Sequence, residues 1–271
     1  PINQSGSMVF DKIPDKRKYF LRQIHRQQSD NPILELASKL QDPAIDFLAF
    51  DQLVREASVS DERVIYSQRV DIDLMAFSPV LVWRNSTRIR LINAFREAHS
   101  ITETELIPGE PLICDGIELP LKHRKKRIDL EARGLVKGAH VIYLGPGRKP
   151  GFSKLYIIGS DDPQVSAASI VKIEKPDVEE PFIPFAARMG ATFLHGSAVT
   201  IHKSQGSQWE QVQVISSDLA IAARTGRVES GQPLWKRLTY VAITRAQHQL
   251  NWVTRNRLSK PKIPLDTTKL I

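Results

Sequence analysis

Two polar segments of the sequence combine residue types that suit the binding of phosphate groups. The first, residues 200–209, reads TIHKSQGSQW. Its histidine, lysine, serine and glutamine supply hydrogen-bond donors at four consecutive positions, and Gly206 lets a ligand approach the backbone closely. A polar surface turn is the alternative interpretation, but such a turn would rarely need so many donors. The segment therefore predicts a site for an anionic ligand.

The second segment, residues 237–246, reads RLTYVAITRA and continues a helical pattern predicted for residues 234–247. Arg245 comes four residues after Val241 and seven after Leu238, which predicts that it lies on the helix face directed at the protein interior. A buried guanidinium needs an anionic partner, because an unpaired buried charge is costly. A triphosphate would serve as that partner.

Predicted strands flank both segments. Apolar runs at 198–201, 212–215 and 250–253 read as short buried strands. A further run at 79–83 is followed by a polar loop and by a helical pattern from Ile89 to Ala98. A strand, a polar loop and a helix in this order form half of a parallel α/β unit, and such sheets bind ligands at the carboxyl ends of their strands.

The chain changes character between residues 109 and 173. Short β-rich runs at 111–114, 140–144, 155–158 and 170–173 alternate with glycine, proline and charged turns, a pattern typical of a small antiparallel barrel. Before this region the spacing predicts helices over residues 18–41, with Asp30 or Asn31 as the cap of a helix that begins at Pro32. A proline-punctuated link spans 176–184. The sequence thus predicts a discontinuous α/β domain, residues 1–105 and 180–271, with residues 109–173 inserted as a β-rich module.

Composition narrows the class of protein. Among 271 residues, 38 Lys and Arg exceed 30 Asp and Glu by 8, and the sequence pI is about 9.6, which favours an anionic partner such as nucleic acid. The single cysteine, Cys114, excludes an intrachain disulfide and a thiolate zinc cluster. No apolar run is long enough to span a membrane and no signal peptide is present, so a cytoplasmic location is expected. The chain begins at Pro1 without an initiator methionine, which suggests a piece of a longer protein.

The two polar segments resemble motifs V and VI of superfamily 1 helicases of the UvrD/RecD-like type, which read roughly T-x-H-K-S-Q-G-x-E-F and Y-x-A-x-T-R-A. The run Ile24–Gln27, followed by Asn31–Ile33, resembles motif IV, and Val80–Asn85 resembles the next strand and its DNA-contacting loop. In the RecD and Dda branch an SH3-like β module is inserted before motif V, and residues 109–173 occupy that place. The resemblance implies an α/β fold with a RecA-like parallel sheet flanked by helices and an inserted SH3-like barrel.

The resemblance also implies roles for individual residues. Arg26 and Arg245 would contact the γ-phosphate of ATP as catalytic arginines. Gly206 and Gln208 would lie at the nucleotide, although the family commonly has glutamate at the position of Gln208. The residues expected to face the DNA strand are Thr200, His202, Lys203, Arg84 and Asn85.

The P-loop pattern G-x-x-x-x-G-K-[ST] does not occur in the sequence, and no Asp-Glu pair follows an apolar strand. The resemblance implies ATP and Mg²⁺ as cofactors, and because this chain lacks a P-loop, the Mg²⁺ ligands are expected in an upstream P-loop RecA-like domain. The expected function is that of the C-terminal motor portion of an ATP-dependent DNA helicase that translocates on single-stranded DNA, with this chain alone inactive. Two alternatives stay open: a non-catalytic nucleic-acid-binding module with a helicase-like surface, and an RNA-directed superfamily 1 helicase.

Several other sequence features are interpreted as structural rather than functional. The basic run 122–127 reads as a solvated loop, with DNA contact as the alternative. The glycine-rich run 145–151 joins two β runs and opens no helix, which predicts a hairpin turn. Three tryptophans, Trp83, Trp209 and Trp252, end or follow apolar strands and are expected in the core, and Cys114 is expected to be a buried, inert thiol.

Overall fold

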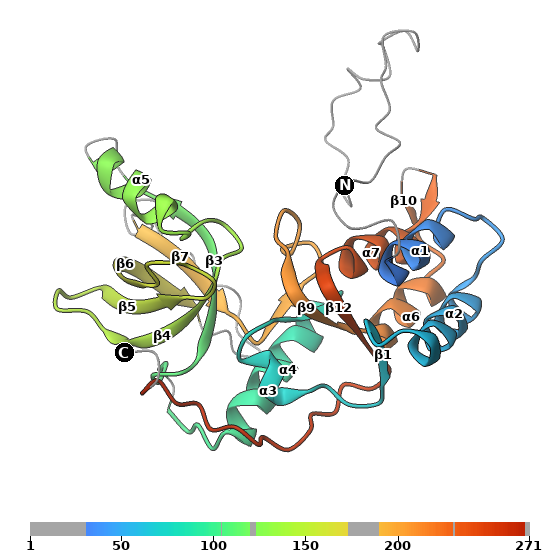
Figure 1. Cartoon of the computed structure of the whole chain (residues 1–271), viewed down its shortest axis with the longest axis horizontal. Helices are drawn as coiled ribbons and strands as arrows, with labels where there is room; N and C mark the ends of the chain where they lie inside the picture. The colour runs from blue at the N-terminus through green and yellow to red at the C-terminus, as the bar shows by residue number, and fades with distance from the viewer. Residues whose placement is uncertain (1–30, 104, 120–122, 173–189, 230, 269–271) are drawn as a thin grey trace, which may run out of the picture.

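The computed structural model describes residues 31–103, 105–119, 123–172, 190–229 and 231–268 (Figure 1). Figure 1 shows a barrel on one side of the molecule and a helix-flanked sheet on the other. The helical pattern predicted before Arg26, Arg26 itself and the predicted link 176–184 lie outside the described residues.

The sheet has five strands in the order β1-β12-β9-β2-β8, and every neighbouring pair is parallel. This confirms the predicted α/β class and the parallel sheet. Four of the strands correspond to predicted runs, whereas β1 was not predicted because it is short and only its first residue is fully buried. The strands are β1 (Val64–Ser67), β2 (Val80–Val82), β8 (Ala198–Thr200), β9 (Trp209–Ile215) and β12 (Ala246–Val253).

Helices cover both faces of this sheet because its strand residues are apolar on both sides. Leu81, Val214 and Trp252 point into one core, whereas Val80 and Ile215 point into the other. The first core is covered by α1 (Pro32–Lys39), α2 (Phe47–Ser60), α6 (Ser216–Arg224) and α7 (Leu234–Ile243). The second is covered by α3 (Ile72–Met75) and α4 (Asn85–Ala98). The result is a three-layer α/β domain.

Two helix ends bear on the predictions. Helix α1 begins at Pro32 as expected, and Asn31 caps it by accepting a hydrogen bond from the Ile33 N–H at 2.8 Å. Helix α7 ends at Ile243, not at Gln247 as the periodicity predicted. The reason is that residues from Ala246 onward pair with β9, so that tertiary pairing prevails over the local helical pattern. Arg245 therefore lies in the turn between α7 and β12.

The inserted module is a closed barrel of five strands in the order β3-β4-β5-β6-β7. Its strands are β3 (Pro111–Glu118), β4 (His140–Pro146), β5 (Phe152–Ile157), β6 (Gln164–Lys172) and β7 (Gly190–His195). Two features differ from the predicted module. Strand β7 closes the barrel although it lies within the range 180–271 that was assigned to the α/β domain, and the pair β6–β7 is parallel although an antiparallel barrel was expected. Closure explains the first difference, because without β7 the edges of β3 and β6 would be unpaired.

Local features of the barrel match some predictions and correct another. Residues 147–151 form the turn between β4 and β5, as predicted, and the Cys114 side chain is fully buried. Burial raises the pKa of the Cys114 thiol to about 11, in keeping with an inert thiol. The basic run predicted as a loop instead opens helix α5 (Arg124–Ala132), whose first turns are exposed.

A small β10–β11 hairpin (Val228–Glu229 and Gln232–Pro233) precedes α7.

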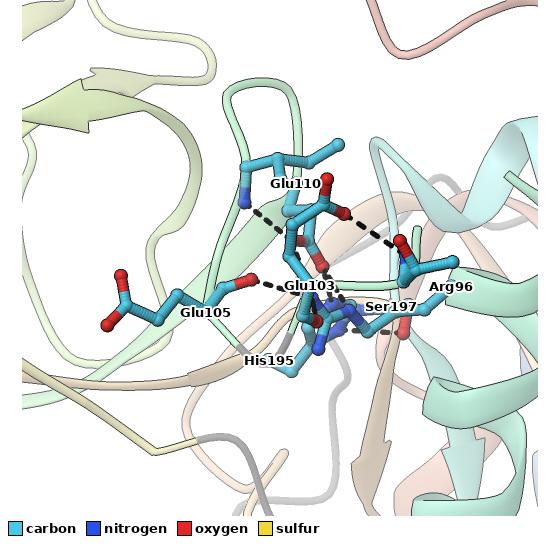
Figure 2. A network of polar contacts seen from close by, with 8 residues as sticks. Arg96, Glu103, Glu105, Glu110, His195 and Ser197 are labelled. Carbon is cyan, nitrogen blue, oxygen red and sulfur yellow. Dashed lines mark hydrogen bonds and ion pairs between the residues drawn. The ribbon is translucent and has the colours of Figure 1, made fainter. Parts of the chain in front are cut away.

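The chain crosses between the two parts of the molecule twice, and a buried polar network holds these crossings together (Figure 2). At the first crossing, Glu110 precedes β3, and at the second, His195 ends β7. The His195 Nε2 and Glu110 Oε2 atoms lie 3.0 Å apart, and the His195 Nδ1 lies 2.9 Å from the Ser197 Oγ. Between these residues, the Gly196 N–H donates to the Pro111 carbonyl at 2.7 Å. The exit from the barrel is thus bonded directly to its entrance.

Arg96, near the end of α4, supplies the positive charge of this network. Its Nε lies 3.0 Å from the Glu110 Oε2 in a pair whose side chains are 9% and 0% exposed. One of its terminal nitrogens also donates to the carbonyls of Glu103 and Glu105 at 2.8 and 2.7 Å. Because removal of one member of a buried ion pair leaves the other charge uncompensated, this network should contribute strongly to stability.

We predict that Arg96→Met lowers the free energy of unfolding by about 3–5 kcal/mol, because it leaves the Glu110 carboxylate buried without its cation. The matched control is Arg127→Met, which breaks an exposed ion pair with Glu131 on α5 and should cost less than about 1 kcal/mol. Urea unfolding measures both. Adding Glu110→Gln to Arg96→Met should recover part of the loss, whereas equal costs for the two arginine variants would contradict a stabilising role for the network.

Candidate functional site

The first polar segment runs from one edge of the sheet to the other. Leu81 pairs with both Val199 and Val214, so the carboxyl end of β8 at Thr200 lies level with the carboxyl end of β9. Trp209, where β9 begins, lies five residues before Val214, which corresponds to about 17 Å of strand. Residues 201–208 must therefore return from the carboxyl edge of the sheet to its amino edge.

Internal hydrogen bonds give this connection a compact, turned shape. The Ser204 N–H donates to the Thr200 carbonyl at 3.0 Å, and the buried Ser204 hydroxyl donates to the Ile201 carbonyl at 2.8 Å. The Ser207 N–H in turn donates to the Ser204 carbonyl at 3.1 Å. Gly206, directly before Ser207, has a φ of +89°, a backbone conformation that favours glycine, and the space beside its Cα is open.

Arg84 and Asn85 lie at the same sheet edge as Thr200, since Val82 pairs with Thr200. Arg84 does not extend freely from this edge. Its Nε and one terminal nitrogen donate to the Asp218 Oδ1 at 3.0 and 2.7 Å, and its backbone N–H donates to the Asp218 Oδ2 at 2.9 Å. Asn85 begins α4 and accepts a hydrogen bond from the Arg88 Nε at 2.8 Å.

Asp218 is the residue that organises this edge. It is 1% exposed and also accepts from the Trp83 N–H and the Thr87 hydroxyl. A carboxylate with this many donors fixes the loop after β2 and the first turn of α4. Sequence reasoning missed it because Asp218 lies on α6, more than 130 positions from the loop that it holds, and no local pattern connects the two.

His202 and Lys203 point toward different neighbours. The Lys203 Nζ forms an ion pair with the Asp115 Oδ2 of β3 at 3.0 Å, and its side chain is 51% exposed. His202 is half-buried, and burial is the main cause that lowers the pKa of its imidazole, with Arg227 acting in the same direction and Glu229 against it. The charges that act on the His202 pKa thus lie at and just before β10, whereas Lys203 connects the segment to the barrel.

Arg245 holds the far end of the segment. Its side chain is 8% exposed, and it donates from Nε to the Val241 carbonyl at 3.0 Å and from its terminal nitrogens to the Ser207 carbonyl at 2.9 Å and the Thr244 hydroxyl at 3.1 Å. Its carbonyl accepts from the Trp209 N–H at 3.0 Å. The two predicted motifs thus meet through main-chain oxygens, and Gln208 lies exposed between Ser207 and Trp209.

The barrel contacts the same part of the segment from another direction. Gly138, in the turn before β4, has φ +87°, and a Cβ built there would overlap the Ser207 side chain. Ser207 is therefore held by Arg245 and by the barrel together. Neither Asp115 nor Gly138 was identified from sequence, because both belong to the inserted module and contact the segment only after folding.

The structure divides the predicted site residues between the two edges of the sheet. Thr200, Arg84 and Asn85 lie at the carboxyl edge, and Gln208 and Arg245 lie at the amino edge. Gly206 belongs to the connection between them, whereas Arg26 lies outside the described residues. In the part of the chain that the structure describes, no group of three His, Cys, Asp or Glu side chains is placed to hold a metal ion. Within the same residues, no helix is long and apolar enough to cross a membrane.

Residues 195–253 match the UvrD-like helicase C-terminal domain. The UvrD-like segment begins at His195 in the buried network, contains both polar motifs and ends with β12. No curated protein sequence matches the chain.

Among solved structures, the chain is similar to Bacteroides Pif1 bound to single-stranded DNA, with 11% identity, a TM-score of 0.43, and coverage of 86% of this chain and 50% of that one. It is also similar to a Pif1 helicase from Candida albicans, with 14% identity, a TM-score of 0.41, and coverage of 89% and 57%. The chain spans about half the length of these structures.

His140, the first residue of β4, makes the free energy of unfolding depend on pH. Burial, with a smaller contribution from His195, lowers its pKa to about 3 from the ordinary value of 6.5. The folded protein therefore binds this proton only near pH 3, whereas the unfolded chain binds it from about pH 6.5 downward. Its share of stability is intact above pH 6.5 and is lost progressively as the pH falls toward 3.

We predict that, between pH 6.5 and 4.5, the free energy of unfolding falls by about 2 kcal/mol less in His140→Phe than in the parent. Urea unfolding at several pH values measures the slope. The matched control, His248→Gln, changes an exposed histidine and should leave the slope as in the parent. An unchanged slope in His140→Phe would show that His140 is not held neutral in the folded protein.

Proposed function

We propose that this chain forms the second motor domain of an ATP-dependent DNA helicase of superfamily 1 that translocates on single-stranded DNA. The observation that carries the proposal is that the UvrD-like segment, residues 195–253, connects a polar sheet edge to a buried arginine through one short, braced connection. A motor domain needs such a connection, because movement at the nucleotide must be transmitted to the strand.

On the strand side, we assign phosphate contacts to Thr200, His202 and Lys203, with Asn85 at the adjoining helix start. Lys203 is the best placed of these, because an exposed ion pair such as Lys203–Asp115 is worth little and a phosphate can replace Asp115. Arg84 is assigned a different role from the one its type suggests. Because its Nε and one terminal nitrogen donate to Asp218, Arg84 positions the loop rather than contributing a free charge.

On the nucleotide side, we assign Arg245 to the γ-phosphate of ATP, with Gly206 and Gln208 nearby and Arg26 as a second arginine. ATP and Mg²⁺ would be bound in the cleft toward an upstream P-loop RecA-like domain, and that domain would supply the lysine and the metal ligands. The guanidinium fork of Arg245 is already oriented by main-chain acceptors, which reduces the reorganisation needed when charge develops on the phosphate.

A second candidate function is a nucleic-acid-binding module without hydrolysis, and the geometry of Arg245 favours it in one respect. Three acceptors of the guanidinium are neutral protein oxygens, as a structural brace requires. An RNA strand would use the same phosphate chemistry as DNA, so the preference between the two must be measured with oligonucleotides of both kinds.

The test is Arg245→Lys in the longer protein that includes the upstream P-loop domain. We predict that ATP turnover falls about 10³-fold, the lower end of arginine-finger effects, while single-strand affinity changes by less than about threefold. Lysine keeps the charge but loses the planar fork. The matched control is Thr244→Val, which removes one acceptor of the fork and should leave turnover within about threefold of the parent.

ATP turnover by the parent decides between the two candidates, because a module without hydrolysis would bind the strand and show no turnover. If the parent hydrolyses ATP but Arg245 only braces Ser207, Arg245→Lys should lower strand affinity and turnover by similar factors. Parental turnover in Arg245→Lys would refute the assignment to ATP. The reading frame upstream of Pro1 provides an independent check, since a reading frame without a P-loop would contradict the motor proposal.

A further inference from the structure

A cavity of about 660 Å³ lies between the barrel and the sheet. Its barrel wall is formed by Gly134 and by residues 136–140 and 158–159, and the opposite wall by Leu74, Phe77 and Ser78 and by residues 206–211 with Gln247. Its size falls within the range of small-molecule sites, about 300–1,000 Å³. None of the site residues assigned above except Gly206 and Gln208 lines it.

Two aromatic side chains in the cavity wall have unsatisfied polar atoms. The indole Nε1 of Trp209 and both ring nitrogens of His140 are buried without a hydrogen-bond partner, and the two side chains are 8% and 5% exposed. A buried polar group without a partner costs about 1–3 kcal/mol. An occupant of the cavity that offers an acceptor to the indole, and either an acceptor or a donor to the neutral imidazole, would remove this cost.

The remaining surface of the cavity favours a flat, uncharged ligand. Phe77 is 51% exposed and Val136 is 47% exposed, although both are large apolar side chains. The charged lining residues are Lys137 and Glu210, one of each sign. Phosphate sites concentrate cations, whereas an aromatic ring, apolar walls and a few directed polar groups suit a heteroaromatic ring that stacks and hydrogen-bonds.

We propose that this cavity binds one unstacked nucleobase of the single strand whose phosphates contact Thr200, His202 and Lys203. The proposal rests on the proposed strand-binding function. Gly206 lines the cavity and follows Lys203 by three residues, so the phosphate-binding part of the segment and the cavity are at most about 11 Å apart along the chain. A base in this position contacts the barrel and the segment together.

The experiment compares two oligonucleotides with the same phosphates, one with all its bases and one with abasic sites, at one salt concentration. The parent should bind the base-containing strand about tenfold more tightly, because one stacked base contributes about 1–3 kcal/mol. Trp209→Phe, which keeps an aromatic ring but removes the N–H, should lose about fivefold on the base-containing strand and nothing on the abasic strand.

Two further variants keep the test decisive. Phe77→Ala changes an exposed side chain, so folding is retained, and it should also weaken binding of the base-containing strand alone. Trp235→Phe is the matched control, because Trp235 is also a buried tryptophan but lies outside the cavity, and it should bind both strands as the parent does.

Each outcome has one meaning. Parental affinities of Trp209→Phe and Phe77→Ala for the base-containing strand would overturn the base site while leaving the proposed strand binding intact. A parent that binds neither strand would instead overturn the proposed function. Free nucleosides are then titrated into the parent and Trp209→Phe: weaker saturation of Trp209→Phe than of the parent supports the base site, and equal behaviour of the two proteins overturns it.

Discussion

The connection between β8 and β9 is the constraint on which the rest of the site depends. Two parallel strands of one sheet are joined here by only eight residues, 201–208, which must cover about 17 Å from one sheet edge to the other. A connection this short has little freedom. Its backbone conformation is fixed by its internal hydrogen bonds, by the left-handed conformation of Gly206 and by the bond from Arg245 to the Ser207 carbonyl. This conformation sets the positions of the predicted phosphate-binding residues.

The barrel is part of this constraint and not an appendage. Lys203 pairs with Asp115 of β3, and Gly138 lies directly against Ser207, so the connection is packed between the barrel and the sheet. The buried network of Arg96, Glu110 and His195 fixes the two points where the chain enters and leaves the barrel. A shift of the barrel would thus move the connection, and the Ser207 carbonyl would carry that shift to Arg245.

The sequence predicted the elements whose patterns are local. The strand and helix from Pro79 to Ala98, the Asn31 cap and the hairpin turn at 147–151 all follow from short-range rules, and the structure contains them. The same rules placed Arg245 within a helix, because the pairing of β12 with β9 overrides the helical periodicity after Ile243. Strand β7 was assigned to the wrong part of the molecule because barrel closure joins distant segments. Asp218, Asp115 and Gly138 were missed for the same reason, since each acts on residues far from it in sequence. The assignments of the site residues to DNA and ATP stay predictions.

Amide hydrogen exchange in Gly138→Ala tests most directly the claim that the barrel holds the connection. The amides of Ser204, Ser207 and Trp209 report on it, because each donates within the connection or to Arg245. Gly151→Ala is the matched control: its φ of +74° imposes the same kind of backbone strain as the +87° of Gly138, but the added methyl group would enter open space. We predict that exchange of these three amides is about tenfold faster in Gly138→Ala and unchanged in Gly151→Ala. A decrease of about 1.4 kcal/mol in the free energy of local opening gives that factor. Parental exchange rates in Gly138→Ala would contradict the account, because the connection would then keep its path without the barrel.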